Sequence, residues 1–182
     1  AEVFAGRSPL PIVVDPVMVA TSGARLLEPD AVAALRERLL PLASLITPNL
    51  PEAAILLDAE EARVRVTWET AERLAERYGC AVYLKGGHDA ERAGADLLWV
   101  DGTAQWLESP VVPNAAAHGT GCSLSAAIAA NLAVGRSIQE AALRAKAYVF
   151  GSLANARTVG PNLRTMMPPE KLPLERIVTG ER

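Results

Sequence analysis

Residues 44–57 read SLITPNLPEAAILL and contain one complete strand–helix unit. The apolar run Ser44–Thr47 has the length of a buried strand, and Pro51 falls in the first turn of a helix expected over Leu50–Leu57, where its missing N–H has no intrahelical partner to lose. Short apolar runs alternate with helical periodicity along most of the chain. This alternation is typical of a covered, mostly parallel sheet whose strands are joined by helices.

The neighbouring segments repeat the unit. We expect strands at Ile12–Val14 and Ala81–Leu84. Helices are expected at Pro29–Leu40 and at Thr67–Tyr78, where Gly79 occupies the C′ position. Residues 12–84 are therefore expected to form two strand–helix units followed by a third strand of one α/β sheet.

The C-terminal half adds a hairpin and two long helices. Asp101-Gly102 separates two apolar runs and tolerates the positive φ angles of a tight turn. Ser137-Ile-Gln-Glu140 has the form of a capping box, and four prolines from Pro161 onward predict coil for the tail after Val159. The elements expected here are strands at Asp96–Val100 and Gln105–Leu107 and helices at Gly119–Val134 and from Ser137 to about Ala156. We predict a single α/β domain over residues 1–182.

Composition excludes several classes of protein. The 182 residues carry 18 Lys+Arg against 21 Asp+Glu, a net charge of −3, and no basic run, so a nucleic-acid or membrane-surface partner is not indicated. No apolar stretch has the length of a membrane span, and the first residues lack the pattern of a secretory signal, so we expect a cytoplasmic protein. Cys80 and Cys122 have no partner at the spacing of a zinc site, and neither a zinc site nor a disulfide framework is expected.

The most informative segment is His118-Gly119-Thr120-Gly121-Cys122, directly before a long apolar helix. Unpaired N–H groups and the positive end of the helix dipole favour an anion there, and glycines let the backbone approach a phosphate closely. The dipole also favours the thiolate of Cys122, which can then act as a base or nucleophile. The competing interpretations are an ordinary glycine-rich helix start and a cysteine that packs as a small apolar residue, which is how we interpret Cys80.

Polar residues also follow the first two expected strands. Asp15 ends the first strand, while Asn49 ends the second and Glu52 stands in the next helical turn. Because ligands bind beyond the carboxyl ends of the strands in open α/β sheets, Asp15 and Glu52 can share Mg²⁺ with substrate phosphates. The alternatives are a turn aspartate before Pro16 and a glutamate that only complements the helix dipole.

Lys85-Gly86-Gly87-His88 follows the third expected strand. A lysine at this position can reach a phosphate, and the glycines leave room for a nucleotide, although the same residues also form plain turns. His88 and His118 have no third ligand at metal-site spacing, so we interpret them as loop residues or neighbours of a phosphate. Three strand ends and one helix start thus offer phosphate-binding or metal-binding groups at one edge of the sheet.

Four motifs together resemble a known family. They are DPVM followed by SG and LL (residues 15–27), LITPNLPEA (45–53), LKGGH (84–88) and HGTGCSLSAAIAA (118–130). In this order and spacing they are similar to the hydroxymethylpyrimidine phosphate kinases of thiamine biosynthesis, within the ribokinase-like family. The resemblance covers about residues 11–160, and the cysteine in the GTGC segment separates this branch from the sugar kinases.

The resemblance implies a fold and a chemistry. The expected fold is a three-layer α/β/α sandwich without its N-terminal part, and the expected activity is phosphorylation of hydroxymethylpyrimidine and its monophosphate with ATP and Mg²⁺, by a homodimer. It implies an anion hole from Gly119, Thr120 and Gly121 for the transferring phosphoryl group and a catalytic role for Cys122. By the same resemblance, Asp15, Asn49 and Glu52 would serve Mg²⁺ and the phosphate tail. Lys85, Asn49 and Thr120 would bind the nucleotide, and Val17 would contact the pyrimidine.

Several positions depart from the family pattern. Thr21 and Ala24 replace a lysine and an aspartate, Ala116-Ala117 replaces Asn-Thr, and the segment from Gly160 to Arg164 lacks the usual histidine. The family's N-terminal portion is absent, and residue 1 is Ala, so we expect the numbering to begin inside a larger protein. Two alternatives therefore stay open: a kinase for a related ring alcohol such as pyridoxal, and a nucleotide-binding fragment without catalysis.

Overall fold

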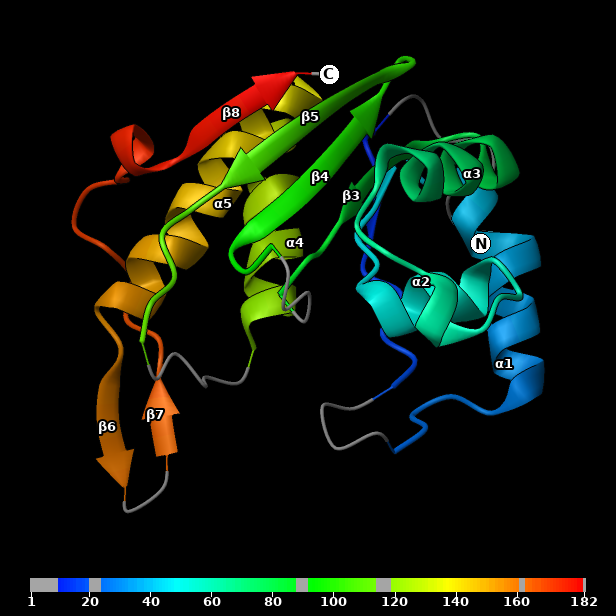
Figure 1. Cartoon of the computed structure of the whole chain (residues 1–182), viewed down its shortest axis with the longest axis horizontal. Helices are drawn as coiled ribbons and strands as arrows, with labels where there is room; N and C mark the ends of the chain where they lie inside the picture. Colours follow the sequence, from blue (N-terminus) through cyan, green and yellow to red (C-terminus); the bar gives the residue numbers. More distant parts are fainter. Residues whose placement is uncertain (1–9, 20–23, 88–91, 114–118, 161–162, 182) are drawn as a thin grey trace.

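A computed structural model describes residues 10–19, 24–87, 92–113, 119–160 and 163–181. Its central sheet has six strands in the order β1-β2-β3-β4-β5-β8 (Figure 1). The strands are β1 (Val13–Val14), β2 (Leu45–Ile46), β3 (Ala81–Leu84), β4 (Ala95–Val100), β5 (Thr103–Glu108) and β8 (Val178–Glu181).

The sheet combines parallel and antiparallel pairings. Strands β1, β2 and β3 are parallel, whereas β4 is antiparallel to both of its neighbours and β8 is antiparallel to β5. Four of the six strands, β1, β2, β3 and β5, therefore run in one direction, as expected for a mostly parallel sheet with a hairpin. The hairpin turn adopts the predicted positive φ angles, 51° at Asp101 and 77° at Gly102.

Helices cover both faces of the sheet, which gives three layers. Successive strand residues point to opposite faces: Ile46 and Val82 join one apolar cluster, whereas Leu45 and Tyr83 join the other. The first cluster packs under α1 (Pro29–Ala34), α2 (Leu50–Leu56) and α3 (Trp68–Tyr78). The second packs under α4 (Thr120–Ala133) and α5 (Ile138–Ala154), so the expected α/β/α sandwich is confirmed.

Local capping signals explain where the helices begin and end. The Asn49 and Glu52 side chains form a reciprocal capping box at the start of α2. The predicted helix over residues 29–40 changes character along its length, because α1 continues as the π-helical turn η1 (Leu35–Leu39) and the 3₁₀ turn η2 (Leu40–Leu42). Ser137 accepts the Glu140 N–H at the start of α5 as expected, but the Glu140 carboxylate accepts from Arg136.

The prediction of coil from Val159 onward holds for residues 166–173 and is wrong for the segments on either side of them. Residues Arg157–Gly160 (β6) and Leu163–Thr165 (β7) form a two-stranded ribbon that projects from the body at the end where α4 begins (Figure 1). After the 3₁₀ turn η4 (Leu174–Arg176), β8 pairs with the free edge of β5. The backbone of a neighbouring strand supplies this pairing, so the short polar sequence of β8 carries no local signal for it.

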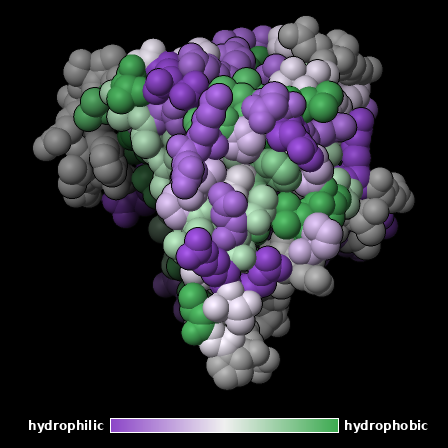
Figure 2. Space-filling model, turned by 90° about the vertical axis from the view of Figure 1, so that its left-hand side faces the viewer, coloured by the Kyte–Doolittle hydropathy of each residue, from purple (hydrophilic) through white to green (hydrophobic). Residues whose placement is uncertain are grey.

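The surface that carries β8 and the ribbon is mainly hydrophilic. Figure 2 shows hydrophobic residues there as small groups separated by hydrophilic ones. Among the described residues, no helix has the length and apolar character to cross a membrane.

Candidate active site

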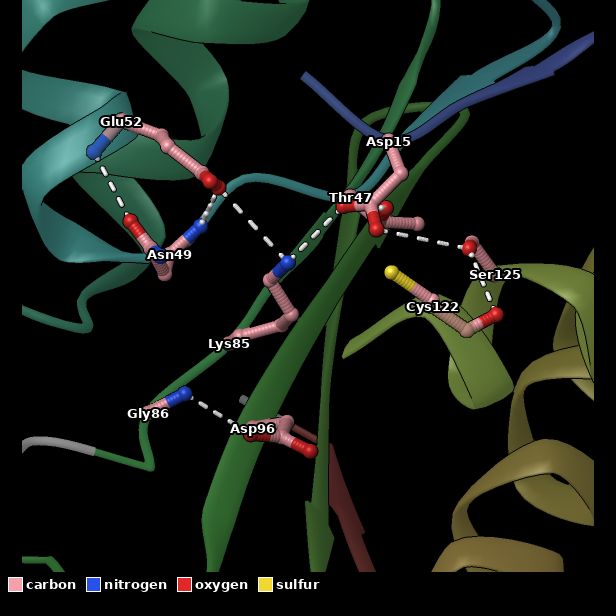
Figure 3. A network of polar contacts seen from close by, with 9 residues as sticks. All are labelled: Asp15, Thr47, Asn49, Glu52, Lys85, Gly86, Asp96, Cys122 and Ser125. Atoms are coloured by element: carbon pink, nitrogen blue, oxygen red, sulfur yellow. Dashed lines mark hydrogen bonds and ion pairs between the residues drawn. The ribbon is translucent and has the colours of Figure 1, made fainter. Parts of the chain in front are cut away.

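The carboxyl ends of three parallel strands meet the first turn of α4 (Figure 3). Asp15 directly follows β1, Thr47 follows β2 and Lys85 follows β3. Parallel strands end at the same edge of the sheet. Thr47 and Lys85, which are 32 and 70 positions from Asp15 in the chain, therefore lie within hydrogen-bond distance of its carboxylate. The predicted convergence of strand ends is therefore present in the structure.

Lys85 is the centre of this cluster. Its Nζ atom lies 2.9 Å from Asp15 Oδ1 and 3.6 Å from Glu52 Oε2. All three side chains are largely buried, with exposed fractions of 15% for Lys85, 12% for Asp15 and 2% for Glu52. Asp15 and Glu52, which we predicted to bind a metal, therefore both contact the ammonium group of Lys85, which we predicted to bind the nucleotide.

Glu52 has two roles in the structure. Its carboxylate accepts the Asn49 N–H at 2.8 Å, and Asn49 Oδ1 accepts the Glu52 N–H at 2.8 Å. Burial raises the pKa of Glu52, while the neighbouring positive charge of Lys85 opposes this shift. Glu52 therefore does more than complement the helix dipole: it closes the start of α2 and brings a buried charge to the site.

Thr47 and Ser125 also contact the cluster, and the sequence analysis missed both. The hydroxyl of Thr47, a fully buried residue, donates to Asp15 Oδ1 at 3.0 Å. Ser125 donates to the Cys122 carbonyl oxygen at 3.1 Å, and its hydroxyl lies 3.5 Å from Asp15 Oδ2. The position of Thr47 at the end of the second strand was an available signal, and Ser125 lies one helical turn after Cys122.

The start of α4 approaches the cluster closely. Gly119 caps the helix with φ 87°, a left-handed conformation that favours glycine, and Thr120 is the first helical residue. A Cβ atom at Gly121 would lie 3.2 Å from Lys85 Nζ and 3.8 Å from Asp15 Oδ2. Cys122 is exposed, and Figure 3 shows its thiol directed toward the side where Asp15 and Lys85 lie.

Val17 lies beside the site, two residues after Asp15. The residue is 39% exposed, and its N–H donates to the Asp15 carbonyl oxygen at 2.9 Å. Several residues discussed from the sequence lie outside the described residues, namely Thr21, His88, Ala116, Ala117 and His118. Ala24 is described and exposed.

Two carboxylates of the cluster, those of Asp15 and Glu52, could contact a cation together with a bound nucleotide. Within the described ranges, no group of three or more His, Cys, Asp and Glu side chains could hold a metal ion. Mg²⁺ commonly takes one or two protein carboxylates and completes its coordination with water and substrate phosphates. Asp15 and Glu52 fit this pattern, because both carboxylates already contact the positive charge of Lys85. Burial disfavours the charge of Glu52, and a nearby cation favours it.

Comparison with known proteins assigns the family. A family model described as phosphomethylpyrimidine kinase matches residues 1–167. The chain belongs to the phosphomethylpyrimidine kinase family. The hydroxymethylpyrimidine/phosphomethylpyrimidine kinase of Salmonella typhimurium is 46% identical over 149 residues, which cover 81% of this chain and 56% of the relative. The chain thus spans about half the length of the curated relatives it matches.

Solved structures agree with the ribokinase-like fold of this phosphomethylpyrimidine kinase family member. The pyridoxal kinase of Staphylococcus aureus in complex with AMP-PCP and pyridoxal has a TM-score of 0.81 and 28% identity, over all of this chain and 65% of that one. The phosphomethylpyrimidine kinase of Clostridium difficile has a TM-score of 0.63 and 34% identity, over 78% of this chain and 56% of that one.

Proposed function

We propose that the protein transfers the γ-phosphoryl group of ATP to hydroxymethylpyrimidine and to hydroxymethylpyrimidine phosphate, in thiamine biosynthesis. The observation that carries the proposal is the meeting of Asp15 and Lys85 with the GTGC helix start at one edge of the sheet. Family membership supports the same activity. Phosphoryl transfer depends mainly on positioning and on stabilisation of charge, and this edge of the sheet offers groups for both.

Each site residue has a role in the proposed reaction. The backbone N–H groups at Gly119, Thr120 and Gly121 form the anion hole for the transferring group. With hydroxymethylpyrimidine, Cys122 accepts the proton of the substrate hydroxyl as the hydroxyl oxygen bonds to the γ-phosphorus and the bond from that phosphorus to the β,γ-bridging oxygen breaks, which releases ADP. With hydroxymethylpyrimidine phosphate, an oxygen of the substrate's phosphate group takes the place of the hydroxyl oxygen. Lys85 and Asn49 serve the nucleotide, and Val17 contacts the pyrimidine.

The proposal includes Mg²⁺ as an ATP-bound cofactor. Asp15 and Glu52 would hold it, directly or through water, and the ion would neutralise charge on the nucleotide phosphates. The Lys85 ammonium between these carboxylates keeps their charges compensated and their positions fixed before the nucleotide arrives.

The decisive experiment is a substrate panel. The protein translated from its natural start codon is incubated with MgATP and hydroxymethylpyrimidine, hydroxymethylpyrimidine phosphate, pyridoxal or ribose, and ADP release is measured. We expect kcat/KM for the two pyrimidines to exceed that for pyridoxal at least tenfold. Preference for pyridoxal would overturn the assigned substrate, and MgATP binding without any alcohol-dependent turnover would support the non-catalytic alternative.

A lysine pair controls for general effects of charge. Lys85→Met removes the cation between Asp15 and Glu52, and Lys171→Met removes a cation from an exposed tail residue. We expect only Lys85→Met to weaken MgATP binding, by tenfold or more, in isothermal titration. Equal affinities of the two variants would contradict the role of Lys85.

Two further parts of the proposal concern the whole protein. We propose a homodimer, which light scattering of the purified protein tests, and a cytoplasmic location, which fractionation of the source cells tests. A monomer at micromolar concentration, or recovery in a membrane or secreted fraction, would contradict the respective statement.

A further inference from the structure

Behind the site, a second polar cluster is buried between β3, β4 and α5. Its centre is Asp96, the second residue of β4, whose residue exposure is 8%. Asp96 Oδ2 accepts the Tyr83 hydroxyl at 2.8 Å and Lys146 Nζ at 2.7 Å, and Asp96 Oδ1 accepts the Gly86 N–H at 2.7 Å. None of these groups has a part in the proposed chemistry.

The cluster is an unusual element in an otherwise apolar layer. Tyr83 is fully buried, Lys146 is 8% exposed, and both lie among the apolar side chains between the sheet and α5. A buried ion pair commonly stabilises a fold no better than apolar side chains of the same volume. Stability alone is therefore a weak explanation for a lysine and an aspartate here.

The bond to Gly86 connects this buried cluster with the site (Figure 3). Gly86 directly follows Lys85, and a Cβ atom at Gly86 would lie 2.0 Å from the Ala95 carbonyl oxygen. Only glycine allows so close an approach to β4, and this approach brings the Gly86 N–H to Asp96. On the other side, the Lys85 N–H donates to the Pro48 carbonyl oxygen at 2.9 Å. The Lys85–Gly86 segment is thus held on one side by the residues after β2 and on the other by β4.

From this arrangement we infer that Asp96 is a positioning residue, which holds the Lys85–Gly86 peptide so that the Lys85 ammonium reaches Asp15, Glu52 and the nucleotide phosphates. Lys146 compensates the charge of Asp96 inside the fold. The inference rests on the proposed function for the nucleotide role of Lys85. It adds a contribution from β4 and α5 to a site whose other described groups come from the β1, β2 and β3 ends and from α2 and α4.

Two double variants isolate the bond to Gly86. Asp96→Asn with Lys146→Met retains an oxygen for the Gly86 N–H, and its amide can donate to the Tyr83 hydroxyl. Asp96→Leu with Lys146→Met has the same branching and number of side-chain heavy atoms at position 96 and no acceptor. Neither variant leaves a buried charge without its partner, so both are expected to fold, and circular dichroism and thermal unfolding check that they do.

The inference separates these variants by nucleotide affinity. We expect the Asn/Met protein to keep its Kd and KM for MgATP within about twofold of the wild type, and the Leu/Met protein to raise both about tenfold. The KM for the alcohol is expected to change less than twofold in both. Tyr83→Phe is the matched control, because it removes one donor to Asp96 and leaves Gly86 bound; its KM for MgATP is expected to stay within twofold.

A purely structural role predicts a different pattern. If the Asn/Met and Leu/Met proteins had equal Kd values for MgATP and differed only in stability or active fraction, the positioning role would be overturned. Hydrogen exchange at the Gly86 amide gives a readout that needs no substrate: we expect slow exchange in the Asn/Met protein and fast exchange in the Leu/Met protein. If the wild type bound no nucleotide, the proposed function would fail, while equal exchange rates would still overturn the positioning role independently.

Discussion

The two cysteines, Cys122 and Cys80, differ in their exposure to solvent. Cys122 is exposed in the first turn of α4, whereas Cys80 packs against the core at the start of β3. Burial raises the pKa of the Cys80 thiol to about 11, so this thiol stays protonated and unreactive near neutral pH. The apolar interpretation of Cys80 agrees with this placement.

We expect Cys122→Ala to lower kcat by about 100-fold or more, because general base catalysis typically contributes that much. The KM for MgATP should change little, since the anion hole is made of backbone groups. Steady-state kinetics measure both constants. Cys80→Ala is the control and should retain kcat within about twofold; full turnover by Cys122→Ala would remove the thiol from the mechanism.

Glu52 gives the site a dependence on pH. Its pKa is raised in the folded protein, mainly by burial, so the folded state binds a proton more tightly than the unfolded state. The stability that this difference contributes is present below the unfolded pKa and is lost as pH rises through the folded pKa. We therefore expect the free energy of unfolding of the wild type, relative to Glu52→Gln, to fall from pH 4 to pH 7.

Urea unfolding of both proteins across this pH range measures the difference. Glutamine keeps a carbonyl oxygen for the Asn49 N–H, so the variant tests the charge rather than the capping box. If the stability of the wild type relative to Glu52→Gln were constant with pH, or increased toward pH 7, the raised pKa of Glu52 would be contradicted.

At the scale of elements, helix ends depend on single backbone conformations. The last residue of α3 is followed by Gly79 at φ 69°, and the Gly79 N–H donates to the Ala75 carbonyl oxygen at 2.7 Å. The space around Gly79 is open, since a Cβ atom there would have no neighbour within 4 Å. Any cost of a side chain at Gly79 therefore comes from the backbone conformation alone.

We expect Gly79→Ala to lower the free energy of unfolding by about 1–2 kcal/mol, the cost of a left-handed conformation for an L-residue. Chemical denaturation measures it. Gly180→Ala is the matched control, because Gly180 also has open space and lacks a positive φ angle. A loss at Gly180 equal to that at Gly79 would show that the conformation is not the cause.

For the molecule as a whole, the C-terminal segment of the chain adds the edge strand β8 to the sheet. Strand β8 covers the edge of β5, and Ile177, directly before it, is buried. We propose that residues 1–182 fold as one domain, and β8 then belongs to the same cooperative unit as the strands that carry the site.

Truncation after Ile177 should remove at least about 2 kcal/mol of stability, because several backbone hydrogen bonds of about 1 kcal/mol each are lost. The exposed β5 edge should also promote association. Urea unfolding and size-exclusion chromatography with light scattering measure these effects. Val178→Thr changes an exposed residue of the same strand and serves as the control, with stability unchanged within about 0.5 kcal/mol. A truncated protein as stable and as dispersed as the control would place β8 outside the cooperative unit.

Local sequence accounts for the strand–helix order, the hairpin turn at Asp101-Gly102, the helix end at Gly79 and the polar residues expected at one edge of the sheet. These features follow from local periodicity, capping and turn chemistry, which act over a few residues. Tertiary packing, in contrast, places Lys85 between Asp15 and Glu52, brings Thr47 and Ser125 to Asp15, joins Asp96 to Gly86 and pairs the tail strand β8 with β5. Most of these contacts join segments far apart in the chain, whereas Gly86 and Asp96 are ten residues apart and meet through the register of the β3–β4 pairing. Packing and strand register select all of these partners, and local sequence does not encode them.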